Sequence, residues 1–422
     1  MSGQTIAEKI LAAHSLSDSE VKTGDIINAR LDLVMSHIGT AKVVLDFNKI
    51  RPSKNRKVFD RNKIVILFDH YIPAPSARWA GVHDLIRKFV KKQGIKNFYD
   101  IREGICHQVL PEKGHARPGM LIIGGDSHTT TYGAFNAASC GVGNTDLFYG
   151  YVKGELWFRV PHTIKFNITG KLPSNVMSKD IIVKIAGDYS AEVATYKSIE
   201  FTGDTMENLS IASRMTMSNF ALELGAKFAF GVPDEKVASW VKERTSEPFK
   251  LVKPDPDAVY EKIYEIDVSN LEPQVACPHT VDNVKPISKL ENVKINQAFL
   301  GSCTNGRYED LEIAAKILDG KQIHKDVRMI VTPASKAIWL KAAKSGVAES
   351  LMNAGAIITN PCCGACFGAM GGLLGPSEKC ISSTNRNFKG RMGSPASEVY
   401  LGSPATVAAS ALEGEITDPR EY

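Results

Sequence analysis

The sequence has no uninterrupted apolar run as long as a membrane-spanning helix requires, although 43% of its 422 residues are hydrophobic. Its N-terminus also lacks a basic segment followed by an apolar stretch, which is the pattern of a secretory signal. We therefore expect a globular, cytoplasmic protein with no membrane partner. A chain of this length exceeds one ordinary hydrophobic core and should form two to four domains.

Neither sign of charge dominates the sequence. The 51 basic and 46 acidic side chains leave a net charge of only +5, which does not favour nucleic acid as a partner. The one local basic run, from Lys49 to Lys57, contains Pro52 and Asn55 and is interpreted as a solvated loop. No internal repeat of fixed period and no low-complexity segment is present.

Cysteine is sparse, and its placement indicates chemistry. Eight cysteines without a secretion signal indicate reduced thiols or metal ligands rather than a disulfide framework. In the segment 360–368, Cys363 and Cys366 form a CxxC pair whose sulfurs can reach one centre from a tight turn. Alone, this pair leaves structural zinc, a redox dithiol and an iron–sulfur cluster open. The adjacent Cys362 is an alternative ligand to Cys363.

A third thiol decides between these alternatives. No second CxxC and no Cys/His pair is present to complete the four ligands of a structural zinc site. Cys303, however, lies where an apolar run, expected as a strand, ends in the small and polar residues 301–307. Three thiolates from two loops suit a four-iron cluster with one iron free of protein ligands and open to substrate. The other cysteines, at 106, 140, 277 and 380, are interpreted as core residues.

Acidic and histidine side chains follow expected strands. The aliphatic run at 63–68 ends in an Asp-His pair, and the run at 120–123 leads into Asp-Ser-His. Because α/β folds place chemistry at the carboxyl ends of their strands, these side chains are candidates for one site. A further histidine follows a short strand expected at 97–100. The candidates are Asp69, His70, His107, Asp126, Ser127 and His128.

Two other segments carry candidate polar groups. A helix is expected from Ser213 to Phe228, in which Asn219 and Glu223 are four residues apart and share a face. Arg386 and Arg391 lie in a loop of small polar residues, and guanidinium groups bind carboxylates bidentately. A cluster, Asp/His pairs and two arginines together describe a site for an anionic hydroxy acid.

Five motifs occur in order along the chain. They are GICHQVLPE at 104–112, GGDSHTTTYGA at 124–134, GSCTNGR at 301–307, CGACFG at 363–368 and NRNFKGRMGS at 385–394. With these motifs the chain resembles the aconitase superfamily over essentially its whole length. Within it, the resemblance is to the large subunits of two-subunit enzymes of the 3-isopropylmalate dehydratase and homoaconitase type.

The resemblance implies a [4Fe–4S] cluster held by Cys303, Cys363 and Cys366, whose fourth iron binds the substrate hydroxyl and a carboxylate. It also implies a role for each candidate side chain. Asp69 with His70 and Asp126 with His128 would be acid pairs, and His107 would assist the hydroxyl or water site. The residues that would hold substrate are Ser127, Arg386 and Arg391. Asn219 and Asn385 would lie near the cluster, and Glu223 would lie beside the iron-bound water.

The fold implied by the resemblance is three α/β domains around a central iron–sulfur cluster. We expect them at residues 1–160, 161–285 and 286–422, with a proline-rich linker at 246–290. The family's catalytic base is a serine on a swivelling domain, and nothing after residue 394 could form one. We therefore expect an obligate small subunit that carries this domain.

The implied activity is that of a hydro-lyase that dehydrates and rehydrates a malate-type di- or tricarboxylic hydroxy acid. The first candidate substrate is 3-isopropylmalate, of leucine biosynthesis, and homoaconitate and 2,3-dimethylmalate are alternatives. Binding of RNA or sensing of iron after cluster loss is a more distant alternative, against which the low net charge argues.

The chain departs from the family pattern at a few positions. Ile38 follows His37 where an acidic residue is usual, and Ala365 and Phe367 replace a proline and an aliphatic residue in the cysteine loop. The loss of a carboxylate at Ile38 favours a pocket for a substrate with an alkyl group.

Overall fold

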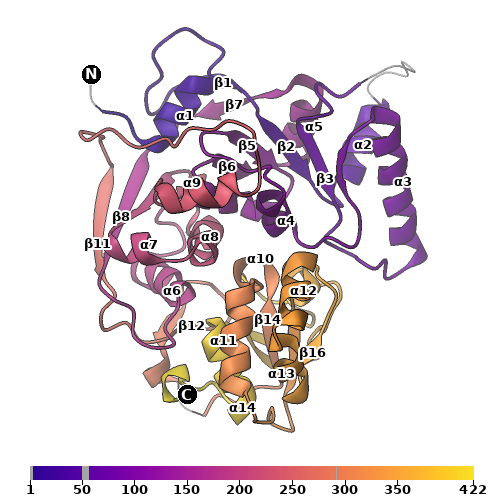
Figure 1. The fold of residues 1–422 in the computed structure, drawn as a ribbon, viewed down its shortest axis with the longest axis vertical. Coiled ribbons are helices and arrows are strands. Elements are labelled where there is room, and N and C mark those ends of the chain that lie inside the picture. The colour runs from indigo at the N-terminus through magenta and orange to yellow at the C-terminus, as the bar shows by residue number, and fades with distance from the viewer. Residues whose placement is uncertain (1–2, 50–56, 291) are drawn as a thin grey trace.

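A computed structural model describes residues 3–49, 57–290 and 292–422, so most of the expected basic loop lies outside the described residues (Figure 1). The described residues form one two-stranded and three larger sheets with helices packed between and around them. The predicted α/β class is confirmed. No helix in the described ranges combines the length and apolar character needed to cross a bilayer.

The first large sheet has five parallel strands in the order β4-β3-β2-β5-β6. They are β2 (Leu33–Ser36), β3 (Ile64–Leu67), β4 (Asn97–Tyr99), β5 (Leu121–Gly124) and β6 (Ala138–Gly141). Every residue of β2, β3 and β5 is buried, because a strand covered on both faces needs apolar side chains on both.

Helices cover both faces of this sheet. One face carries Val34 and Ile66 and packs in a single apolar cluster with α1, α2, α3 and α5. The other face carries Met35 and Leu67, which share a second cluster with residues of α4 and η1. These elements are α1 (Ile6–His14), α2 (Thr40–Lys49), α3 (Ala77–Gln93), α4 (Cys106–Glu112), η1 (Ser127–Phe135) and α5 (Asn144–Lys153). Helix α1 begins with a capping box formed by Thr5 and Glu8.

A two-stranded antiparallel ribbon of β1 (Ile26–Arg30) and β7 (Glu155–Arg159) lies beside the first sheet. Strand β1 of this ribbon and strand β2 of the first sheet are thus separate strands. The chain turns between them at Asp32, whose carboxylate accepts the Leu121 backbone N–H at 2.9 Å. A tertiary hydrogen bond of this kind is invisible to a local hydrophobic pattern.

The second large sheet has four parallel strands in the order β10-β9-β8-β11. They are β8 (Thr163–Thr169), β9 (Ser198–Thr202), β10 (Phe228–Phe230) and β11 (Lys262–Asp267). The helices of this part are α6 (Ser178–Tyr189), α7 (Asp204–Asn208), α8 (Ile211–Phe220), η2 (Ala221–Leu224) and α9 (Glu235–Lys242). The helix expected to run to Phe228 is wrong at its end, because Gly225 at φ 84° stops it and Phe228 begins β10.

The third large sheet has seven strands in the order β13-β12-β18-β17-β14-β15-β16, and β12 and β13 are its antiparallel members. They are β12 (Gln274–Ala276), β13 (Val284–Pro286), β14 (Gln297–Gly301), β15 (Arg328–Thr332), β16 (Ile357–Ile358), β17 (Lys379–Ser382) and β18 (Glu398–Leu401). Its helices are η3 (Ile287–Lys289), α10 (Ser302–Asn305), α11 (Tyr308–Leu318), α12 (Lys336–Lys344), α13 (Val347–Asn353), η4 (Gly364–Phe367), α14 (Pro404–Glu413) and η5 (Pro419–Glu421).

The segment 246–290 is more ordered than the expected linker, because it contributes β11 to the second sheet and β12 and β13 to the third. Three of its six prolines precede β11, two lie between the strands, and Pro286 is the last residue of β13. The domain boundaries expected at residues 160 and 285 stay a prediction.

The carboxyl edges of the first and third sheets face each other. Strands β3, β2 and β5 are parallel neighbours, so the residues that follow them emerge at one edge. Strands β17, β14 and β15 are parallel neighbours in the third sheet. The two edges meet where the backbone N–H of Cys363 donates to the carbonyl oxygen of Asp69 at 2.9 Å.

Candidate active site

Asp69 and His70 form a buried ion pair just after β3. His70 Nδ1 donates to Asp69 Oδ1 at 2.6 Å, and the backbone N–H of Cys106 donates to Oδ2 at 3.0 Å. Burial alone would raise the pKa of Asp69, but His70 and this N–H lower it to about 2. Burial would conversely lower the pKa of His70, and the Asp69 carboxylate raises it. The pair therefore favours a protonated imidazole beside a carboxylate.

Asp126, after β5, gathers the other histidines. His107 Nε2 donates to Asp126 Oδ1 at 2.7 Å, and the backbone N–H of His128 donates to the same oxygen at 2.8 Å. His37 Nε2 lies 3.6 Å from Oδ2. Burial opposes ionisation, but these groups hold the pKa of Asp126 well below its usual range. The shortest ring contact of Asp126 is thus with His107, and the ring of His128 lies farther away, with Nδ1 3.7 Å from the same oxygen.

The ring of His128 instead contacts Glu223. His128 Nε2 donates to Glu223 Oε1 at 2.9 Å, and Arg386 Nε donates to the same oxygen at 2.8 Å. Burial would raise the pKa of Glu223, but His128 and then Arg386 lower it. Ser127 Oγ lies 3.3 Å from His128 Nδ1, which brings the serine into the same network.

Three buried thiols come from two loops of the third sheet. Cys303 lies in α10, just after β14, and Cys363 and Cys366 lie at η4. Glycine is required in the second loop, since Gly364 has φ 57° and Gly368 has φ 77°. A Cβ at Gly368 would lie 2.5 Å from the carbonyl oxygen of Arg391, so this glycine lets the cysteine loop approach the arginine loop.

The surroundings of the thiols fit an anionic metal cluster. Asn385 Nδ2 donates to Cys303 Sγ at 3.3 Å, and Arg391 Nη2 donates to Cys366 Sγ at 3.9 Å. Asn385 Oδ1 and Arg391 Nε are buried without a hydrogen-bond partner among the described residues. Buried polar atoms of this kind normally have a partner, so these two are available to a further group at this position.

The raised pKa values of the thiols also favour a bound metal cluster. Burial raises the pKa of Cys303 to about 12, and burial with nearby anions, including Asp69, raises that of Cys363 well above its ordinary value. Such cysteines become thiolates only beside a strong positive charge, which iron supplies. In the described part of the chain, the group of three possible metal ligands whose ligand atoms all lie within 4.8 Å of one another consists of His37, Asp69 and His70. Within the same described residues, the three cysteines do not form such a group. A cubane cluster suits three thiolates from two loops, because each thiolate binds a different iron.

Asn219 links the second sheet's helices to this centre. Its Nδ2 donates to Thr131 Oγ1 at 2.8 Å, and Thr304 Oγ1 donates to its Oδ1 at 3.3 Å. Thr304 directly follows the candidate ligand Cys303, so the amide is held between η1 and α10. Asn219 and Glu223 both reach the site, although they belong to two successive helices and not to one.

The structure thus gathers all of the side chains predicted from the sequence, and it adds three that the sequence analysis missed. His37 has the same place after β2 that the Asp-His pair has after β3, and this parallel could have indicated it. Arg307, in the GSCTNGR motif, donates to the carbonyl oxygens of Cys303, at 2.6 Å, and Thr304. Lys179 is fully buried under the arginine loop, and its sequence context gives no sign of this.

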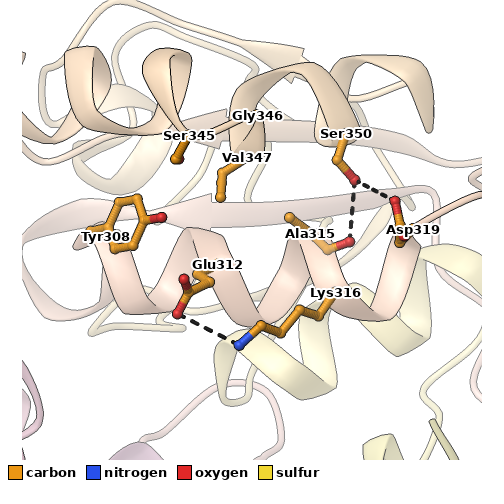
Figure 2. A pocket seen from close by; sticks show the side chains of 9 residues that line it. All are labelled: Tyr308, Glu312, Ala315, Lys316, Asp319, Ser345, Gly346, Val347 and Ser350. Atoms are coloured by element: carbon orange, nitrogen blue, oxygen red, sulfur yellow. Dashed lines mark hydrogen bonds and ion pairs between the residues drawn. The ribbon is translucent and has the colours of Figure 1, made fainter.

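A surface hollow of about 380 Å³ lies away from this site, between α11 and α13 (Figure 2). Its walls include Tyr308, Glu312 and Ser350, and none of its residues belongs to the site. Ser350 Oγ donates to the carbonyl oxygen of Ala315 at 3.3 Å across its edge.

The chain belongs to the aconitase family. The family model described as Aconitase family (aconitate hydratase) matches residues 8–292 and 285–414. The 3-isopropylmalate dehydratase large subunit 1 of Methanopyrus kandleri is 50% identical over 420 residues, which cover 100% of both chains. A probable methanogen homoaconitase large subunit of Methanothermobacter thermautotrophicus is 47% identical over 99% of this chain and 97% of its own.

A third relative is the probable 3-isopropylmalate dehydratase large subunit of Methanosarcina mazei, at 50% identity over 99% of this chain and 100% of its own. Among solved structures, aconitase X from Thermococcus kodakaraensis in its holo-form matches with a TM-score of 0.48 and 12% identity, over 85% of this chain and 84% of its own. A likeness this distant says nothing about the site.

Proposed function

We propose that this chain is the large subunit of an iron–sulfur hydro-lyase that dehydrates and rehydrates a malate-type hydroxy acid, with 3-isopropylmalate as its substrate. The observation that carries the proposal is the meeting of three buried thiols with the Asp69–His70 and His107–Asp126 pairs at two facing sheet edges. Relatives named as 3-isopropylmalate dehydratase large subunits support it at about 50% identity over their whole length.

Cys303, Cys363 and Cys366 would hold a [4Fe–4S] cluster, which supplies a Lewis-acidic iron for the substrate hydroxyl when bound. The chain's own residues would supply protons. His70, whose pKa is raised by the Asp69 carboxylate against the effect of burial, is the candidate donor to the departing hydroxyl. His107 would hold the hydroxyl or water in place, because Asp126 fixes its ring.

The two arginines would hold the carboxylates. Arg386 uses its Nε on Glu223, and no hydrogen bond of its two terminal nitrogens is found within the described part of the chain. Its guanidinium can therefore receive a carboxylate with its free edge. Arg391 sits against Cys366, which places a second cation beside the candidate cluster. A dicarboxylate is the anion that two such groups suit.

The base that removes the carbon-bound proton would come from a separate small subunit. Support comes from the relatives, which are named as large subunits. The alignment with this chain covers 97% to 100% of their length. The histidines and arginines named above are set to donate hydrogen bonds, and the Asp69, Asp126 and Glu223 carboxylates are engaged by them. We therefore expect the large chain alone to be inactive.

The test is anaerobic reconstitution of the chain with and without its co-expressed small subunit. We expect iron uptake by the chain alone and turnover only by the complex, followed by the ultraviolet absorbance of the alkene product. Assays with 3-isopropylmalate, 2,3-dimethylmalate and homocitrate separate the substrate candidates. A chain that takes up no iron, or that turns over substrate without its partner, would overturn the proposal.

Homoaconitase is the second candidate. It is favoured by the probable methanogen homoaconitase large subunit, which is 47% identical to this chain. It requires a third carboxylate on the substrate, and hence a further cation in the site. Preference for homocitrate over 3-isopropylmalate in the panel would select it.

A further inference from the structure

Lys179 is the most deeply buried cation near the candidate cluster. It is the second residue of α6, and its side chain is 0% exposed. Its Nζ donates to the carbonyl oxygens of Thr384, at 2.7 Å, and Ser383, at 3.3 Å. The same ammonium lies 4.5 Å from the ring centroid of Phe220. Burial lowers the pKa of Lys179 to about 7.

Two of the three contacts of this ammonium, those with Thr384 and Phe220, adjoin an asparagine that hydrogen-bonds a candidate ligand. Thr384 precedes Asn385, whose amide donates to Cys303 Sγ at 3.3 Å. Phe220 follows Asn219, the second asparagine beside that thiol. Burial raises the pKa of Cys303, and hydrogen bonds from Asn219 and Asn385 oppose the rise. The ammonium therefore links the last residue of α8 to the arginine loop after β17.

The position of Lys179 has no explanation in helix stability. It lies in the first turn of α6, where the helix dipole disfavours a cation. The neighbouring Asp180 already satisfies the local backbone, because its carboxylate accepts the N–H groups of Met177 at 2.8 Å and Gln274 at 2.9 Å. An apolar side chain of similar length would fill the same space without the desolvation cost of an ammonium. The contacts that require the ammonium of a lysine are its hydrogen bonds to the carbonyl oxygens of Ser383 and Thr384 in the arginine loop.

We propose that Lys179 is a positioning residue: its ammonium fixes the backbone at residues 383–384, so that Asn385 reaches Cys303 and Arg386 reaches Glu223. The inference rests on the proposed function, because it concerns the same site. Lys179 touches neither substrate nor cluster ligand in this arrangement and acts through Arg386 and the two asparagines.

The first test needs no cofactor. Lys179→Met removes the donors at nearly constant length, and Lys179→Gln keeps an uncharged donor. Lys184→Met is the matched control on the same helix, where the half-buried lysine pairs with Asp188 at 2.8 Å. Hydrogen exchange of the apo-chain is measured for the peptide that spans 382–391. We expect exchange at least about tenfold faster in Lys179→Met, a smaller increase in Lys179→Gln and none in the control.

The second test is kinetic and uses the reconstituted complex with its small subunit. Because Arg386 is a candidate carboxylate ligand, Lys179→Met should raise KM for the hydroxy acid about tenfold or more, and lower kcat less. In a double-mutant cycle with Arg386→Gln, the two effects should not add, since one residue acts through the other.

The outcomes separate this inference from the proposed function. An inactive wild-type complex overturns the function, whereas an active one with additive effects overturns the role of Lys179. Faster exchange that spreads through α6 and the second sheet indicates a merely structural residue and also overturns it. If Lys179→Met does not fold, Lys179→Gln carries both tests, and unchanged loop exchange and KM in that variant contradict the proposal.

Discussion

Arg386 donates to Glu223 through Nε at 2.8 Å, and this ion pair joins the loop after β17 to the short helix η2 that precedes β10. The carboxylate is 5% exposed and the guanidinium 22%, so the pair lies at the inner edge of the site. Because His128 donates to the same oxygen at 2.9 Å, one carboxylate sets the position of a candidate acid and of a candidate carboxylate ligand.

Glu223→Gln should therefore lower kcat strongly while the chain stays folded. The amide has the size of the carboxylate but not its charge, so it cannot fix both His128 and Arg386. We expect a loss of kcat of about a hundredfold, the usual effect of disturbing a positioned acid, and a smaller rise in KM. The measurement is steady-state turnover of the reconstituted complex. The exposed Glu349→Gln on α13 is the control, and an unimpaired Glu223→Gln would remove this residue from the site.

Serine substitutions should decide between the adjacent thiols Cys362 and Cys363. Cys362 Sγ accepts the backbone N–H of Gly364 at 3.3 Å and belongs to the apolar cluster of the first sheet. Cys363 interacts electrostatically with both Cys303 and Cys366. We expect Cys363→Ser to lose most of its iron and visible absorbance after anaerobic reconstitution, and Cys362→Ser to retain both. The reverse result would make Cys362 the ligand.

The local parts of the fold could be predicted from the sequence because they depend on neighbouring residues. The Thr5–Glu8 capping box and the buried strands before Asp69 and Asp126 follow from such short patterns. The end of the helical segment formed by α8 and η2 could not be placed, because the apolar pattern continues into β10 and only Gly225, after η2, marks the change.

The site could be predicted as a set of residues, but its pairing could not. His128 follows Asp126 by two residues, yet its ring bonds Glu223, which is brought close by the second sheet. The shortest ring contact of Asp126 comes from His107 on a separate helix, whereas Nδ1 of His128 lies 3.7 Å away. Lys179 lies in an ordinary amphipathic segment, and only the tertiary packing of α6 under the arginine loop buries it. Pairings of this kind depend on long-range contacts that no local pattern encodes.

The pH dependence of stability should reflect the ion pair of His14 and Asp32, whose Nε2 and Oδ2 lie 2.6 Å apart. Burial alone would lower the pKa of His14, but Asp32 raises it above 6.5, and the same pair lowers the pKa of Asp32 below 3.8. The His14 contribution is full below 6.5 and is lost as pH rises through the raised value. The Asp32 contribution is full above 3.8 and is lost as pH falls.

His14→Gln should therefore cost more stability at pH 6 than at pH 9, by on the order of 1 kcal/mol. The measurement is urea unfolding of the apo-chain at both pH values. His162→Gln is the control, because its ring is exposed and lies 3.8 Å from Glu261. An equal cost at both pH values would show that the pair is not ionised in the folded chain.

Substrate preference should depend on Phe367, which directly follows Cys366. Its ring centroid lies 4.6 Å from that of His70 and 5.0 Å from that of Tyr71, and Tyr71 stacks on Trp79 at 3.5 Å. An aromatic wall therefore adjoins the candidate proton donor. Such a wall favours an alkyl substituent and disfavours a further carboxylate, which would lose its hydration there.

Phe367→Leu should lower kcat/KM for 3-isopropylmalate about tenfold, which is the usual effect of losing a few apolar contacts. The value of kcat/KM for a substrate without the alkyl branch should change less. The ratio of the two values is the informative quantity, because damage to the proton donor would lower both alike. The control is Trp157→Leu, an aromatic residue on β7 that is 54% exposed and remote from the cysteine loop. An unchanged ratio in Phe367→Leu would mean that the alkyl group is recognised elsewhere, and the small subunit would then be the place to search.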